Sequence, residues 1–260
     1  MAVVFKCKEF DIENVVFTQP KQTKHGSTAI YASYRNVDKG GRMHKLRIQL
    51  PKMPVPGGVA IFEKKETNGQ TTKRYSIYLS FSDVDTNERR RVALEKLRKF
   101  DQRIIEELMK NCKSWLKQPN VTRELADILY KHCVRISKDK ETGEPDGKYA
   151  DSIKVNIPVD KDGRVNVPTF DENMNPVDLL TYLTKGCSVI PILQCNGLWV
   201  IASQLHLSWK LENIQIFPSD QLRGFAIKPE SDDEETEEAK EMKEEMKEEE
   251  VVAEEASDDE

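Results

Sequence analysis

Hydrophobic and polar side chains alternate through much of the first 81 residues. The segments TAIYASY (28–34), HKLRIQL (44–50) and RYSIYLSF (74–81) combine this alternation with many β-branched and aromatic residues, as the strands of a half-buried sheet do. Glycine pairs at 40–41 and 57–58 separate these segments at turn-like positions. The pattern predicts short strands in an antiparallel arrangement.

The hydrophobic period changes from two to between three and four after Asp85. The apolar residues that repeat at this spacing are Leu97, Phe100, Ile104, Ile105, Leu108, Cys112, Trp115 and Leu116. They predict one long amphipathic helix, and Asp85 followed by Glu88 resembles a capping box at its start. A second helix is predicted over Arg123 to His132, with Leu125, Ile128 and Leu129 facing inward.

The strand pattern returns after a polar loop. SIKVNIPV (152–159) and RVNVPTF (164–170) flank Asp160 to Gly163 as a predicted hairpin, and DLLTYL (178–183) predicts a brief helix. The block from 187 to 217 is the most β-like of all. In its last strand the apolar residues change from odd to even positions, which predicts a bulge near Glu212 and Asn213. This bulge and the many short strands favour a small antiparallel barrel of the α+β, mainly β class over an open sandwich.

Charge is distributed very unequally along the chain. The 260 residues carry −5 in total, and residues 229–260 hold 18 acidic residues against three lysines, a charge of −15, so residues 1–228 carry +10. The acidic segment has no aromatic residue and too little apolar surface to form a core, which predicts disorder. We expect one domain over residues 1–228, with a helical insertion at about 86–132, and a disordered acidic tail over 229–260.

Opposite charges within one chain indicate a polyanionic partner for the body and a tail that competes with that partner. Fully extended, residues 229–260 reach roughly 100 Å at about 3.3 Å per residue. A body of this size has a radius of gyration of only about 17 Å. The tail is therefore long enough to reach any basic groove on its own domain.

Few residues suggest catalysis, a cofactor or a metal. The five cysteines are odd in number and form no CxxC pair, so neither a disulfide framework nor a zinc site is expected. The glycine pairs lack the context of a phosphate-binding loop. Asp83 and Asp85 form a DxD that suits either a divalent metal or, more simply, a helix cap. We expect a non-enzymatic protein without cofactor, without a membrane partner and in a reducing, intracellular compartment.

Basic and aromatic residues are interleaved in the predicted strands. A groove for single-stranded nucleic acid needs cations for phosphates and flat rings for bases, and this composition supplies both. The rings are Tyr31, Tyr34, Tyr75 and Tyr78. The cations are Arg35, Arg42, Lys45, Arg47, Lys52, Lys73, Arg74 and Lys154. The alternative for each residue is a solvated cation or a ring at the edge of the core.

Several segments are similar to a known family. The runs PKMPVPGGVAIF (51–62), KVNIPVDKDGRVNV (154–167) and GCSVIPILQCNGLWVIASQLHLSWKLENIQIF (186–217) resemble the T7-type single-stranded DNA-binding proteins of nucleocytoplasmic large DNA viruses. The resemblance implies an OB-fold with a helical insertion and sequence-tolerant binding of single strands. It also implies a role in replication, recombination or repair of a viral genome, at a viral replication site in the host cytoplasm or nucleus.

The same resemblance implies that the tail shields the DNA groove and contacts replication partners such as a viral polymerase or helicase. The chain ends Asp258-Asp259-Glu260 rather than in an aromatic residue, which departs from functionally related phage and bacterial proteins and puts docking of a terminal ring in doubt. The sequence does not distinguish DNA from RNA as the bound nucleic acid. A homo-oligomer is also possible. The alternative function is an acidic, histone-chaperone-like interaction protein that binds no nucleic acid.

Overall fold

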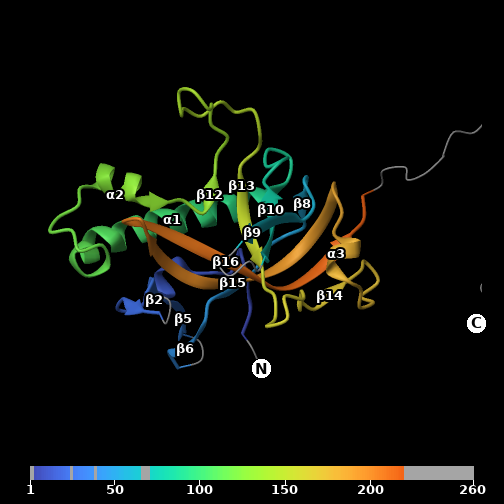
Figure 1. Ribbon diagram of the computed structural model, residues 1–260, viewed down its shortest axis with the longest axis horizontal. Helices are drawn as coiled ribbons and strands as arrows, with labels where there is room; N and C mark the ends of the chain where they lie inside the picture. The colour runs from blue at the N-terminus through green and yellow to red at the C-terminus, as the bar shows by residue number, and fades with distance from the viewer. Residues whose placement is uncertain (1–2, 24–25, 38–39, 66–70, 220–260) are drawn as a thin grey trace, which may run out of the picture. The chain divides into compact units, whose positions relative to one another are not determined.

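Two long C-terminal strands, β15 (Cys187–Ile201) and β16 (Gln204–Phe217), form the central antiparallel hairpin of the fold (Figure 1). In this hairpin Ile192 pairs with Asn213 and Leu193 with Leu211, so Glu212 is the extra residue of a β-bulge. The bulge predicted from the shift in hydrophobic phase is confirmed. The computed structural model describes residues 3–23, 26–37, 40–65 and 71–219, and the predicted tail over 229–260 lies outside them.

The main sheet has the strand order β1-β7-β15-β16-β13-β10-β9. The remaining bounds along this path are β1 Phe5–Lys6, β7 Arg47–Gln49, β9 Ala60–Lys65, β10 Thr71–Ser80 and β13 Ser152–Ile157. Short strands join it beside the path: β3 Lys21–Gln22, β4 Thr28–Ile30, β8 Met53–Val55, β11 Tyr130–Lys131, β12 Val134–Arg135 and β14 Thr169–Phe170. A second sheet contains β2 Val15–Phe17, β5 Ala32–Asn36 and β6 Arg42–Lys45.

Most ladders of the main sheet are antiparallel, as expected, and the others are parallel. β16 pairs in parallel with β11, β13 and β14, and β1 pairs in parallel with β7. Parallel pairs need long crossover connections, and residues 158–203, which join β13 to its parallel partner β16, form such a connection. The sheet also curls until β10 lies beside β8, although the described pairings include no ladder between these two strands. The fold is mainly β and OB-like, with a helical insertion.

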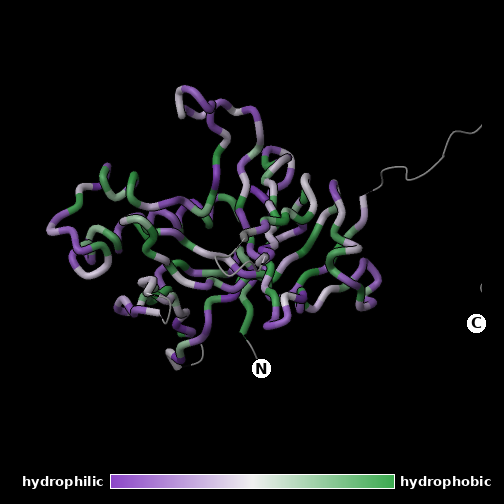
Figure 2. Tube along the Cα trace, in the orientation of Figure 1, coloured by the Kyte–Doolittle hydropathy of each residue, from purple (hydrophilic) through white to green (hydrophobic). Residues whose placement is uncertain are grey.

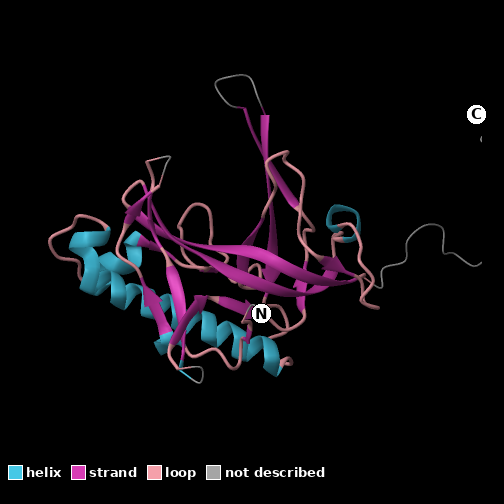
Figure 3. Cartoon of the chain, turned by 90° about the horizontal axis from the view of Figure 1, so that it is seen from below, coloured by secondary structure: helices cyan, strands magenta, loops and turns pink. Residues whose placement is uncertain are grey.

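The long helix α1 (Glu88–Trp115) buries the predicted apolar stripe, including Leu97, Phe100 and Ile104. Figure 3 shows it lying along one side of the strands. Its N-cap is Asn87, whose side chain accepts the N–H of Arg90 at 3.2 Å, so the predicted cap at Asp85 is wrong. The chain turns earlier, at Asp83 with φ +59°, and the amides of Thr86 and Asn87 donate to its carbonyl.

The second helix, α2 (Arg123–Leu129), is shorter than predicted, and of its three apolar residues predicted to face inward only Leu129 packs against the core. Leu125 and Ile128 are 40% and 65% exposed, whereas Ala126 is buried, so their predicted inward orientation is wrong. The side chains of Ala126 and Leu129 lie on the inward side of α2. Two apolar side chains are thereby left at the surface.

The segment after β13 also departs from the prediction. A turn forms at Asp160 to Gly163, but only the bridge between Val159 and Val165 follows it, and β14 leaves to pair with β16. The brief helix α3 (Leu179–Tyr182) is present as predicted.

The core lies between the curved sheet and α1. Trp209 is 1% exposed and its ring centroid lies 6.1 Å from that of Phe100, which joins β16 to the helix. Figure 2 shows apolar residues concentrated along the inner strands and polar residues in the projecting loops. Within the described ranges no helix is both long and apolar enough to cross a membrane.

Candidate nucleic-acid interface

Strands β10, β13 and β16 present one face to the core and the other to solvent, and β9 pairs with β10 at the edge of the sheet. Ile77 and Leu79 of β10 and Val155 of β13 are fully buried, while the residues between them point outward. This alternation follows from the pleat, because successive side chains of a strand leave opposite faces of the sheet. Arg74 and Tyr78 therefore share the outward side.

The register places outward cations beside outward rings. Tyr78 lies opposite Lys154, and Arg74 lies opposite Phe62. Tyr78 and Phe62 are 37% and 62% exposed, so both rings are accessible to a base. On the far side of β13, Lys210 of β16 follows in register beside Asn156. We call Phe62, Arg74, Tyr78, Lys154, Lys210 and Arg135 the basic face.

One carboxylate lies at the edge of this face. Glu212, the bulge residue, accepts from Arg47 Nε at 2.9 Å and lies 3.8 Å from Lys210 Nζ. It is the single acidic residue at the outward positions that the structure describes in β9, β10, β13 and β16. Gln194 lies in register between Arg47 and Lys210, and its side-chain oxygen is buried without a hydrogen-bond partner.

The other end of the basic face is crowded with cations. Lys131 pairs in register with His206, and the Arg135 guanidinium lies 5.6 Å from the Tyr78 ring centroid. Partial burial and the charges of Lys131 and Arg135 lower the pKa of His206. The lowered pKa is consistent with a local surplus of positive charge.

A buried carboxylate in α1 holds this end in place. Asp101 is 1% exposed and accepts three hydrogen bonds, from the Tyr130 hydroxyl at 2.5 Å and from the N–H groups of Cys133 at 3.0 Å and Val134 at 3.2 Å. Burial, and then the charge of Asp101, raise the pKa of Tyr130 well above its ordinary value, so the phenol stays a donor. β11 and β12, which carry Lys131 and Arg135, are thus fastened to the helix.

Four of the predicted site residues come together in this region: Arg47, Arg74, Tyr78 and Lys154. Two predicted residues of β10 lie on the opposite face. Lys73 pairs with Glu63 at 3.0 Å, and Tyr75 packs against the core. Both are displaced from the basic face by the same alternation that brings Arg74 and Tyr78 onto it.

Tyr34 is the clearest correction. It is 4% exposed and its ring packs against Phe5 and Phe10, at centroid distances of 4.3 and 5.8 Å. Its hydroxyl accepts the N–H of Asp11 at 3.3 Å. A ring enclosed in this way has no free face for a base, so the prediction that Tyr34 stacks on nucleic acid is wrong for this conformation.

The remaining predicted residues lie elsewhere. Arg35, Arg42 and Lys45 are exposed on the second sheet, which Figure 1 shows below the main one. Tyr31 is 41% exposed between β4 and β5. Lys52 lies 3.9 Å from the Phe217 ring centroid. The structure does not bring these five residues into the basic face.

Sequence reasoning missed Phe62, Arg135 and Lys210. Phe62 and Arg74 are joined by the β9–β10 pairing, which turn residues near 68–69 could have indicated. Arg135 and Lys210 come from distant segments, and no local signal places them beside β13.

No metal-binding cluster of three or more His, Cys, Asp or Glu occurs among the described residues. The Asp83 carboxylate of the DxD accepts from Arg90 at 3.2 Å. The ion pair with Arg90 therefore accounts for an aspartate at position 83, just before α1.

The fold is similar to those of solved bacteriophage single-stranded DNA-binding proteins. One is gp2.5, encoded by bacteriophage T7, at 9% identity and a TM-score of 0.42, over 73% of this chain and 98% of that one. Another is the protein from bacteriophage Enc34, at 13% identity and a TM-score of 0.38, over 84% and 98%. Its C-terminal truncation gives 10% identity and a TM-score of 0.39, over 80% and 98%.

No family model matches the chain, and no curated protein sequence matches it. The resemblance to proteins of nucleocytoplasmic large DNA viruses therefore stays a prediction. At these identities and TM-scores, the function of this chain has to be argued from its own surface.

Proposed function

We propose that this protein binds single-stranded DNA, without strong sequence preference, through the basic face. The observation that carries the proposal is the register of β9, β10, β13 and β16, which alternates accessible rings with cations on one exposed surface. The cations would bind the phosphates, and the aromatic rings would stack on the unpaired bases. Duplex DNA keeps its bases stacked inside and would use only the cations.

Binding of this kind changes the DNA by occupancy alone. Stacking on an aromatic ring is worth about 1 to 3 kcal/mol per base, and the side chains of both Tyr78 and Phe62 are exposed. A strand held this way is kept from re-forming hairpins. Such an activity would serve replication, recombination or repair of a viral genome, and these roles belong to the same proposal.

For the acidic tail, we propose competition with DNA for the cationic surface and recruitment of replication proteins. The support is the charge of −15 over residues 229–260 against +10 over the remainder. Truncation after Lys228 is expected to tighten binding of oligo-dT. Equal affinities with and without the tail would overturn competition and leave the basic face unaffected.

The experiment that tests DNA binding is fluorescence anisotropy of labelled oligo-dT at graded salt, with duplex DNA in parallel. The observed affinity should fall with salt at a slope of about −0.7 per phosphate contacted, and the duplex should bind more weakly. Tyr78→Ala should weaken binding of the single strand more than that of the duplex.

Tyr182→Ala is the matched control, because Tyr182 is 42% exposed, close to the 37% of Tyr78, and lies on α3 outside the basic face. Equal effects of the two substitutions, or an affinity for oligo-dT that does not respond to salt, would contradict the proposal.

A further inference from the structure

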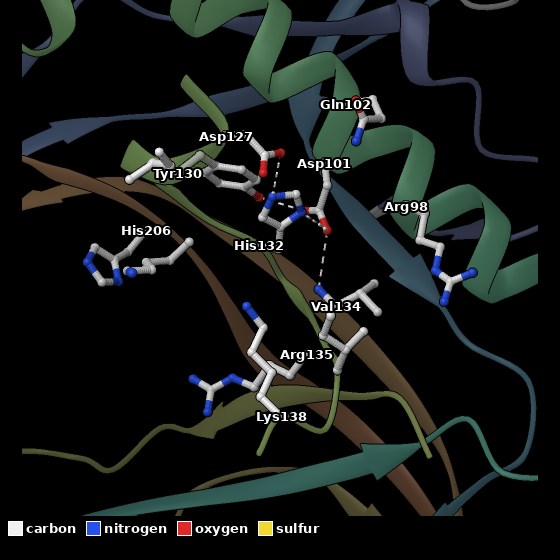
Figure 4. A pocket seen from close by; sticks show the side chains of 13 residues that line it. Arg98, Asp101, Gln102, Asp127, Tyr130, His132, Val134, Arg135, Lys138 and His206 are labelled. Atoms are coloured by element: carbon white, nitrogen blue, oxygen red, sulfur yellow. Dashed lines mark hydrogen bonds and ion pairs between the residues drawn. The ribbon is translucent and has the colours of Figure 1, made fainter. Parts of the chain in front are cut away.

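A cavity of about 910 Å³ opens beside the helical insertion, at the Arg135 end of the basic face. Its walls come from α1, α2, β11, β12, β16 and the start of the loop that follows β12. Figure 4 shows the side chains of Arg135 and Lys138 extending into the same space as His206. No function described so far uses this cavity.

The charges around the cavity favour an anion. The two acidic residues that line it already have protein partners. Asp101 accepts three hydrogen bonds, and the Asp127 carboxylate lies 3.1 Å from His132 Nε2. Among the ion pairs of the described residues, none involves Lys131, Arg135 or Lys138. Three cations thus line the cavity without a carboxylate partner.

The cavity also has an apolar wall. Ile128 of α2 and Ile136, just after β12, line it and are 65% and 43% exposed. An exposed apolar wall beside cations suits a ligand that joins phosphates to flat, weakly hydrated groups. A nucleotide combines these two features, whereas inorganic phosphate has only the first.

The cavity and the basic face meet at Arg135. Arg135 belongs to both, since its guanidinium lies over the Tyr78 ring and also lines the cavity. Along β10, Arg74 and Ser80 are six residues apart, roughly 20 Å at 3.3 Å per residue, and Ser80 pairs with Ser152, the partner of Arg135. A single DNA strand that runs along the basic face from Arg74 toward Ser80 therefore reaches the opening of the cavity.

We propose that the cavity receives the nucleotides of the bound strand that lie beyond the basic face. Lys131, Arg135 and Lys138 hold their phosphates, and Ile128 and Ile136 contact their sugars and bases. This inference rests on the proposed function, because it needs a strand on the basic face. It makes the helical insertion part of the DNA footprint and assigns a role to two exposed isoleucines.

The test compares Lys138→Ala with Lys140→Ala in the full chain. Both lysines are exposed in the loop after β12, but only Lys138 lines the cavity. Oligo-dT of about 4 and about 16 nucleotides, the limits of site sizes for OB folds, distinguishes the face from its extension. Loss of one phosphate contact should weaken the long strand about fivefold at 0.1 M salt and the short strand less, while Lys140→Ala changes neither.

Ile128→Ser and Leu125→Ser form a second matched pair on α2. Both side chains are exposed, but only Ile128 lines the cavity, so only Ile128→Ser should weaken the long strand. Equal behaviour within both pairs, or an equal loss at both lengths, overturns the cavity proposal. If wild type still binds oligo-dT in a salt-dependent way, the proposed function survives that result. Failure of wild type to bind either length overturns both.

Discussion

Arg74 and Lys73 are adjacent in β10, yet they leave opposite faces of the sheet. Arg74 lies opposite Phe62 on the basic face, whereas Lys73 is paired with Glu63 at 3.0 Å on the other side. Arg74→Ala and Lys73→Ala remove the same charge one residue apart, but from opposite faces of the sheet, and Lys73→Ala also removes the ion pair with Glu63. We expect Arg74→Ala to weaken binding of oligo-dT and Lys73→Ala to leave it within about twofold, because charges are screened over about 10 Å at 0.1 M salt.

The magnitude follows from one phosphate contact. For single strands each contact changes log K by about 0.7 per decade of salt, so Arg74→Ala should cost about fivefold at 0.1 M and reduce the salt slope by about 0.7. The assay is anisotropy of labelled oligo-dT over a salt series, with thermal melting to show that both variants fold. Equal losses for the two variants, or an unchanged slope for Arg74→Ala, would refute the assignment of the outward face.

Three other predictions concern the edges of the basic face. Glu212→Gln should tighten oligo-dT binding a few-fold in the same anisotropy assay, because phosphates no longer compete with a carboxylate; weaker binding would contradict this. Asp101→Ala should lower the free energy of unfolding in urea by about 3 kcal/mol or more, since three buried donors lose their acceptor; a change below about 1 kcal/mol would show that these hydrogen bonds are replaced. Bound phosphates should raise the pKa of His206, which partial burial and then the charges of Lys131 and Arg135 lower in the free protein; protons are then taken up on binding, so affinity should rise as pH falls through the histidine range, and His206→Gln should flatten this rise.

The sequence by itself determined the elements whose cause is local. The apolar stripe of α1 required one long helix, because residues three and four apart share a helix face. The change of hydrophobic phase around Glu212 required an extra residue, since a strand keeps one face buried only if its alternation is unbroken or bulged. Both appear in the structure where the pattern places them.

Orientation at the surface was less accessible to sequence reasoning. The leucine and isoleucine pattern of α2 indicated an inward face, but the helix buries Ala126 and leaves Leu125 and Ile128 exposed. Tyr34 is an aromatic residue next to basic residues in the sequence, as a stacking ring would be, but Phe5 and Phe10 pack against it in the structure. In each case the neighbours come from elsewhere in the chain.

The tertiary structure alone decided which cations act together. Arg74, Lys154, Lys210 and Arg135 come from four strands that are far apart in sequence, and the ladders through β13 place them on one face. The number of basic residues could be counted from the chain, but a binding surface depends on their separation and direction. Those are fixed by strand register, which arises from long-range pairing and burial of the core rather than from any local pattern.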